Sequence, residues 1–388
     1  MKTDQGNPER TNRLEILHLL RALGCIYVIL FHYYGYLTLP GAMAPYARIE
    51  PPLLTGYVFF APVLKTLSYL KINSYTGISL FFLISGFVIP ISISRMSIPR
   101  FLYGRVLRIY PLVIIALFLI TVFGYMAGGS FGLFTGSEIV KAGTLFRDFM
   151  WSPYVENAFW TLEVEIKFYI VCSLLAAAPV RFLTKPWAAI GLTAAFLAFF
   201  LVWAGAKDQI FNTDLELYKI IYTLESLFPF LTYMFFGTVV YHVHKKSISR
   251  STGWLVGAIL AISFSVMSWL SWNPTLTSTG FIASYNVALS LFLIAYSLRH
   301  RVKSNRVLNF YADISYPLYL VHATIGFYIM IMAANISTNV NVIFFITFTS
   351  VTALAYLLHH CVELPCQRLK KKTLYTKAAE PSGVKTFP

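Results

Sequence analysis

Ten long apolar runs, separated by short polar or charged connections, make up most of this 388-residue chain. Each run is close to the ~20 residues that an α-helix needs to cross the hydrocarbon core of a bilayer. None shows the alternating pattern of a barrel strand, so helices are the expected spanning form. The chain is therefore predicted to be an all-α polytopic transmembrane bundle of about ten helices. The predicted spans are 14–39, 77–94, 109–127, 159–179, 187–204, 222–243, 253–271, 280–298, 314–334 and 341–360.

Charged residues are few, and their placement predicts the orientation of the chain. Hydrophobic residues make up 57% and charged residues 12% of the sequence, with a mean hydropathy of +0.66; an average soluble domain is about one quarter charged. Lysine and arginine concentrate in alternate connections, while the connections at 272–279 and 335–341 contain none. The positive-inside rule therefore places both termini in the cytoplasm. The net charge of +15 follows from this rule and from contact with the lipid bilayer, and no folded basic domain indicates a nucleic-acid partner.

The chain is predicted to form one membrane domain. The largest outward segments, 40–76, 128–158 and 205–221, are too short for an independent domain. Residues 1–370 are assigned to the transmembrane domain, and residues 371–388 to a disordered cytoplasmic tail. No histidine, cysteine or carboxylate cluster has metal-ligand spacing, so no metal is expected.

Arg21 and His32 lie inside the first apolar run. Eleven residues separate them, which brings both side chains within roughly 20° of one helix face and about 16 Å apart along the axis. A guanidinium inside a bilayer costs several kcal/mol unless it faces water, protein or an anionic ligand. The pair therefore indicates a polar interior site.

The fourth span carries Glu163, Glu165 and Lys167. It runs opposite to the first span, and Glu165 lies about 9 Å below its outer end, at a depth similar to that of His32. A carboxylate there could fix the imidazole tautomer while the histidine takes a proton from a hydroxyl group. Glu163 and Lys167 lie on other faces. The alternative, which stays open, is that Glu165 and Lys167 are structural and paired with other polar groups.

Arg105 and Arg108 are three residues apart near the cytoplasmic end of the third span, and are neighbours if that segment is helical. Two guanidinium groups there suit a phosphate ligand. Ordinary positive-inside flanking is the stronger interpretation on composition alone.

Two further patterns fall within the predicted helices. Tyr316, Tyr319 and His322 recur at helical spacing, which suits either a hydrogen-bonded packing stripe or a pore lining. Ser85 and Gly86 permit close helix approach or a local break, and packing is favoured.

Six short blocks, in order along the chain, resemble the motifs of the acyltransferase-3 family of integral membrane acyltransferases. One departure is His18, where the family often has Asp three residues before the arginine of the first block. The blocks are Arg21 to His32 (R-x10-H), Gly77 to Phe87 (G…LFFxxSGF), Arg105 to Pro111 (RxxRxYP), Trp160 to Tyr169 (W-S/T-L-x-V-E-x-x-F-Y), Ser315 to His322 (SYxxYLxH) and Val362 to Pro365 (VExP).

The resemblance implies that an acyl group, usually acetyl, moves from cytoplasmic acyl-CoA to a hydroxyl of a carbohydrate or lipid-linked glycan across the membrane. Acetyl-CoA would be the co-substrate, without a metal, and the expected location is the bacterial cytoplasmic membrane. The candidate residues are His32 and Glu165 for catalysis; Arg21, Arg105, Arg108, Tyr316, Tyr319 and His322 for acyl-CoA binding; and Ser85, Gly86, Trp160, Glu163 and Lys167 for structure or channel lining.

Two other functions are compatible with the same residues. A secondary transporter of a polar or anionic solute would use the buried charges as a midplane site, but matching halves with interrupted helices are not visible in the sequence. A non-catalytic scaffold ranks last, because it leaves Arg21, Glu165 and Lys167 without a purpose. Homo-oligomerisation stays open.

Overall fold

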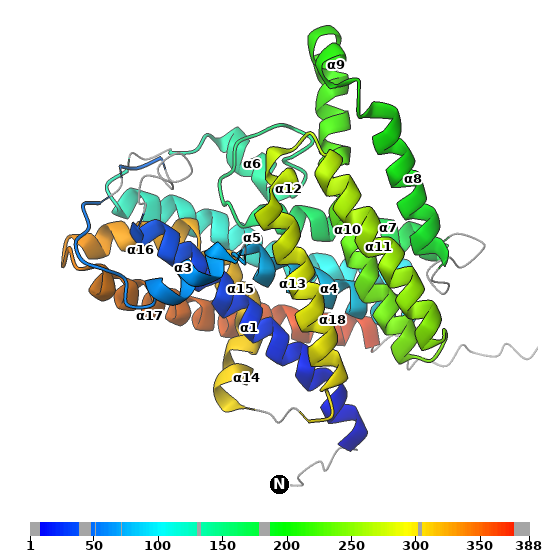
Figure 1. The fold of residues 1–388 in the computed structure, drawn as a ribbon. Coiled ribbons are helices and arrows are strands. Elements are labelled where there is room, and N and C mark those ends of the chain that lie inside the picture. The colour runs from blue at the N-terminus through cyan, green and yellow to red at the C-terminus, as the bar shows by residue number, and fades with distance from the viewer. Residues whose placement is uncertain are drawn as a thin grey trace, which may run out of the picture.

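The computed structural model describes residues 8–38, 48–50, 52–70, 72–129, 133–177, 187–301 and 305–375. These residues form a bundle of helices without a β-strand element, which confirms the predicted all-α fold (Figure 1). The helices are α1 (Pro8–Thr38), α3 (Ala61–Tyr69), α4 (Tyr75–Ile93), α5 (Ile98–Met126), α6 (Gly136–Thr144), α7 (Phe159–Ala177), α8 (Trp187–Trp203), α9 (Lys207–Thr213), α10 (Leu215–His244), α11 (Arg250–Leu270), α12 (Pro274–Thr277), α13 (Thr279–Ser297), α14 (Arg306–Asp313), α15 (Ser315–Val321), α16 (Thr324–Ala334), α17 (Val340–Leu358), the π-helix η3 (His359–Glu363) and α18 (Leu364–Tyr375).

Seven of the described helices are long and apolar enough to cross a membrane, and up to nine spans result if two bent pairs each count as one. The bent pairs are α8 with α9, at 71°, and α15 with α16, at 62°. Helix α7 carries three charged residues, Glu163, Glu165 and Lys167, and is not among these nine. The nine together with α7 correspond to the ten predicted spans.

Several predicted boundaries differ from the structure; α10, for example, begins at Leu215, seven residues before the predicted start of the sixth span. Helix α5 begins at Ile98, eleven residues before the predicted start of the third span, because Ser97 is extended and Pro99 occupies the first helical turn. Arg105 and Arg108 are therefore inside a helix. Residues 371–375, predicted to be disordered, continue α18, and residues 376–388 of the predicted tail lie outside the described residues.

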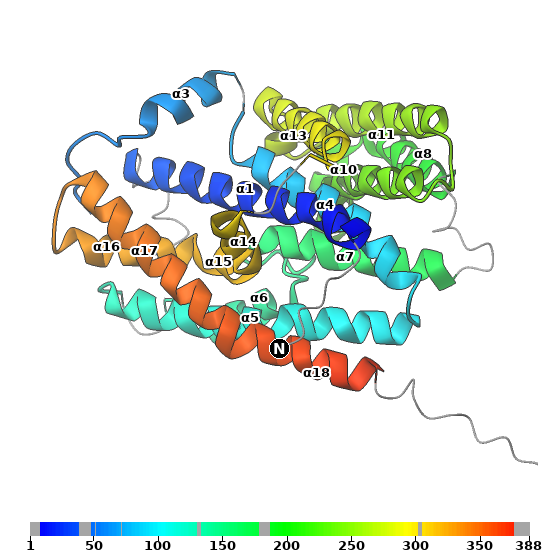
Figure 2. The same cartoon turned by 90° about the horizontal axis from the view of Figure 1, so that it is seen from below.

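Helix α4 is central to the bundle, since it packs against α1, α7, α10 and α13. Figure 2 shows α1 beside α4, with α5 and α18 on the opposite side of α7. The contact between α4 and α10 is close enough that a Cβ on Gly86 would overlap the backbone oxygen of Met234. Thr238 of α10 also donates a hydrogen bond to the carbonyl of Gly86, at 2.9 Å. The structure therefore has a close helix approach at Ser85 and Gly86, and α4 continues through both residues.

The helix is interrupted at Ala323, between α15 and α16. The backbone angles of Ala323, φ −81° and ψ −87°, are not helical. The break leaves the first backbone N–H of α16 without a partner in its own helix. Glu156 supplies one, because a side-chain oxygen accepts the N–H of Thr324 at 3.1 Å. His322 consequently ends α15 at the edge of the break, where its side chain is fully buried.

Gly86→Ala should lower the stability of the bundle. The added methyl group collides with backbone atoms that cannot rotate away, so we expect a loss of roughly 1–3 kcal/mol or more. The measurement is the apparent melting temperature of the purified protein in lipid nanodiscs. Gly35→Ala is the control, because a Cβ at Gly35 meets nothing within 4 Å. Equal melting temperatures for the two variants would contradict the close contact.

Candidate functional site

Two histidines from distant parts of the chain meet in the bundle. His32 of α1 and His322 at the end of α15 are 290 residues apart in the sequence. Nδ1 of His32 lies 3.0 Å from Nε2 of His322. The rings are stacked, with centroids 5.0 Å apart. The other ring nitrogen of His322, Nδ1, lies 2.7 Å from the backbone oxygen of Tyr319. We call His32 and His322 the histidine pair.

The partners of His322 determine which nitrogens carry hydrogen when both rings are neutral. A carbonyl oxygen can only accept a hydrogen bond, so Nδ1 of His322 must be the donor to Tyr319. Nε2 of His322 is then the acceptor, and Nδ1 of His32 must donate to it. The hydroxyl of Tyr36, at 3.5 Å from the same His32 nitrogen, is a longer contact. This arrangement leaves Nε2 of His32 without a hydrogen, and no described residue donates a hydrogen bond to it. Its lone pair can therefore accept a proton, as a general base requires.

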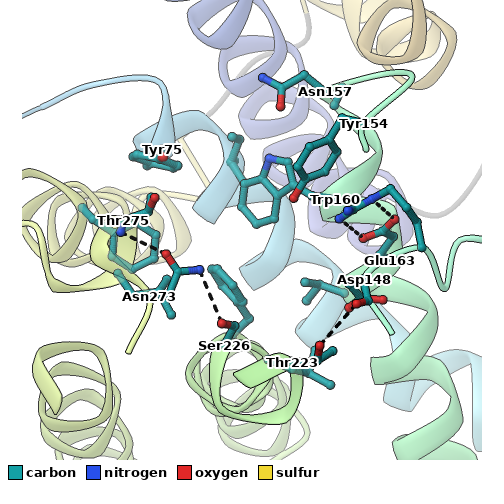
Figure 3. A pocket seen from close by; sticks show the side chains of 18 of the residues that line it. Tyr75, Asp148, Tyr154, Asn157, Trp160, Glu163, Thr223, Ser226, Asn273 and Thr275 are labelled. Atoms are coloured by element: carbon teal, nitrogen blue, oxygen red, sulfur yellow. Dashed lines mark hydrogen bonds and ion pairs between the residues drawn. The ribbon is translucent and has the colours of Figure 1, made fainter. Parts of the chain in front are cut away.

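His32 lines a cavity of about 700 Å³. The walls come from the segment 147–158, the first turns of α7, the first half of α10 and the segment 273–276. Most of the lining is aromatic or carries neutral amide and hydroxyl groups. Figure 3 shows Trp160 in the middle of the cavity, with Tyr154 and Asn157 beside it. We call this the outer cavity, because the predicted topology places the beginnings of α7 and α10 on the outer side.

The charged residues of the outer cavity are paired with one another. Arg147 binds Glu163 through two hydrogen bonds of 3.0 Å, and donates a third, at 2.7 Å, to the carbonyl of Ser152. Lys167 forms an ion pair with Asp148 at 2.9 Å. Buried charges are costly unless they are paired in this way. These four residues therefore fix segment 147–158 against α7.

A second charged cluster lies in the first turns of α5, at the end of the helix that the positive-inside rule places in the cytoplasm. Arg105 donates to the hydroxyl of Ser92 at 2.8 Å and lies over the rings of Phe101 and Tyr169. Arg108 lies 5.9 Å from the ring centre of Tyr316.

Arg21 and Arg108 are within electrostatic reach of each other and of the carboxylates of Glu165 and Glu363. Among the described residues, neither Arg21 nor Arg108 has a hydrogen-bond acceptor for its guanidinium group. Three guanidinium groups face two carboxylates, so the cluster has positive charge to spare for an anion. We call Arg21, Arg105 and Arg108 the arginine cluster.

The family model described as an acyltransferase domain (Acyl_transf_3) matches residues 14–360, which is nearly the whole chain. The chain belongs to the acyltransferase-3 family. It is accordingly a membrane acyltransferase, as the six sequence blocks predict. Searches of curated proteins and of solved structures give no match.

The structure divides the family blocks between the two ends of the bundle. His32, Tyr319, His322 and Trp160 belong to the histidine pair and the outer cavity. The arginine cluster gathers residues of the first and third blocks. The residues predicted to bind acyl-CoA are thus not one group. Tyr316 lies by the arginines, whereas Tyr319 and His322, further along α15, lie at the outer cavity and at the histidine pair.

Glu165 is not brought to His32, contrary to the predicted pairing. Its side chain accepts a hydrogen bond from Ser85 of α4 at 2.8 Å and another from Tyr169, one turn further along α7. Helix α7 thus turns Glu165 toward α4 and the arginine cluster. Within the described residues, the position beside the imidazole of His32 is taken by His322.

Lys167 pairs with Asp148, as the structural alternative for this residue expects, and Glu163 pairs with Arg147. Neither partner was predicted, because both lie in an outward connection whose path the apolar pattern does not determine. The described residues contain no group of three or more histidine, cysteine, aspartate or glutamate side chains that could hold a metal ion.

Glu156 is a further residue that the sequence did not single out. It is fully buried in the connection between α6 and α7, and its two oxygens accept the N–H groups of Ala158 and Thr324. Burial raises the pKa of the Glu156 carboxyl to about 7. By holding the first turn of α16, Glu156 links the wall of the outer cavity to the break beside His322.

Proposed function

We propose that this acyltransferase transfers an acyl group, most simply acetyl, from cytoplasmic acyl-CoA to a hydroxyl group of a glycan on the outer side of the membrane. The observation that carries the proposal is the histidine pair at the outer cavity, in which Nε2 of His32 is left as a base. The same buried charges could serve a transporter, but the acyltransferase family assignment favours acyl transfer.

In the proposed reaction, the acceptor hydroxyl gives its proton to Nε2 of His32 while its oxygen attacks the thioester carbonyl. The bond between the carbonyl carbon and sulfur then breaks. The CoA thiolate leaves and takes the proton from His32, so the products are the ester and free CoA. His322 is a positioning residue here, because its Nε2 accepts the N–H of His32 and stabilises the ring as it becomes positive.

The donor is proposed to bind from the cytoplasmic side. Acyl-CoA carries phosphate groups at one end, and guanidinium groups are well suited to bind phosphate. The arginine cluster offers them, and Arg21 stands about 16 Å from His32 along α1. An extended pantetheine arm would run along this path, with its thioester near the histidine pair. The proposed location is the bacterial cytoplasmic membrane, with a cell-surface or lipid-linked glycan as acceptor.

His32→Ala should abolish acyl transfer without preventing insertion of the protein. Loss of a general base lowers rates by about 100-fold to 10,000-fold. The measurement is mass spectrometry of cell-envelope glycans, which should lose an acetyl increment when only the variant is expressed. His360→Ala is the matched control, because His360 is exposed at the other end of the bundle. Normal acetylation by His32→Ala would refute the assignment of the base.

Arg21→Gln and Arg108→Gln should each raise the KM for acetyl-CoA by roughly tenfold or more, because each removes one charged contact to the donor. The measurement is thiol release from acetyl-CoA by membranes containing each variant. Arg100→Gln is the control, since Arg100 is exposed on the same helix, α5. An unchanged KM in both test variants would count against a donor site at the arginine cluster.

A further inference from the structure

Among the described residues, the outer cavity has no unpaired charge to offer a ligand. The ionised side chains in its lining are Arg147, Asp148 and Glu163. Arg147 and Glu163 bind each other through two hydrogen bonds, and Asp148 binds Lys167. Two positive and two negative groups therefore cancel, in contrast to the arginine cluster. A phosphate or carboxylate group would have to displace one of these pairs, at a considerable cost in free energy.

The cavity does offer neutral hydrogen-bonding groups. Asn157 lines it, and the side-chain amide of Asn157 has no hydrogen-bond partner among the described residues. The indole N–H of Trp160 likewise has no acceptor there, although its ring packs against Phe82 and Phe230. Figure 3 shows both side chains among those that line the cavity. An amide supplies donors and an acceptor, and an indole supplies one donor, so the two together suit hydroxyl groups.

The aromatic lining completes the pattern. The Trp160 ring stands at the centre of the cavity, and the Tyr154 ring beside it is held over Arg147, 3.7 Å from the guanidinium carbon. A sugar ring has an apolar face of C–H groups and a rim of hydroxyls. The apolar face suits an aromatic surface, while the rim needs neutral donors and acceptors. The volume of about 700 Å³ is typical of sites for small ligands.

We infer that the outer cavity is the acceptor site and that it selects an uncharged sugar ring, which packs on Trp160 and is hydrogen-bonded by Asn157. The inference rests on the proposed function for the meaning of the site, because His32 lines the same cavity. It goes further in specifying the ligand: a sugar bearing a carboxylate or phosphate at this position is excluded. A lipid chain is also disfavoured, since it would leave both polar groups unpaired.

The test is direct binding in the absence of acyl-CoA, which separates the acceptor site from the chemistry. Saturation-transfer NMR is recorded on the protein in nanodiscs with the methyl glycosides of glucose, galactose, mannose and N-acetylglucosamine, and with methyl glucuronide as a charged counterpart of methyl glucoside. At least one neutral glycoside should show transfer concentrated on its ring C–H protons. Methyl glucuronide should bind at least about tenfold more weakly than methyl glucoside.

Three variants identify the residues that bind. Trp160→Ala should abolish the signal, while Trp160→Phe should retain part of it, since Phe keeps an aromatic surface but loses the N–H group. Asn157→Ala should weaken binding about tenfold, as expected for the loss of hydrogen bonds to a ligand. Arg100→Gln, at an exposed position of α5, is the control and should bind like the unaltered protein.

The inference is overturned if no neutral glycoside binds, if methyl glucuronide binds best, or if Trp160→Ala and Asn157→Ala bind normally. Because no acyl-CoA is present, these outcomes do not depend on whether His32 is the base. Conversely, loss of acetylation in His32→Ala with normal sugar binding would leave both conclusions intact. Trp160→Phe keeps the experiment informative if Trp160→Ala does not fold.

Discussion

The hydrogen bond from Nδ1 of His322 to the carbonyl oxygen of Tyr319 determines the chemistry available in this protein. A backbone carbonyl has no proton to give, so this contact fixes the tautomer of His322 and, through it, that of His32. The geometry depends on the break at Ala323, which ends α15 at His322. Glu156 stabilises the break by capping α16, and thereby joins the pair to the outer wall.

Charge is distributed unequally between the two ends of the bundle, and this asymmetry matches the two proposed substrates. At the outer cavity, Arg147 and Lys167 are neutralised by Glu163 and Asp148. At the arginine cluster, positive charge remains. An apolar bundle can hold charged groups only where they have partners or an anionic ligand. The inner end therefore suits the phosphates of a donor, and the outer end an uncharged acceptor, with the histidine pair between them.

The sequence predicts the spans well, because each apolar run of about 20 residues has a single favourable environment. It also predicts that Arg21 and His32 lie on one path, since helical periodicity relates residues eleven positions apart. It cannot predict the partner of His32. Depth alone made Glu165 a candidate, but depth does not determine how α7 is rotated about its axis. His322 is 290 residues away, and its position depends on a break that no apolar pattern shows.

The most direct test of the central claim is the protonation state of the two rings, measured by long-range ¹H–¹⁵N NMR on protein labelled with ¹⁵N in its histidine rings. The signals of His32 and His322 are identified by their loss in His32→Asn and His322→Asn. We predict a proton on Nδ1 and a bare Nε2 in both rings. A proton on Nε2 of His32 would contradict the proposed base and the hydrogen-bond chain that orients it.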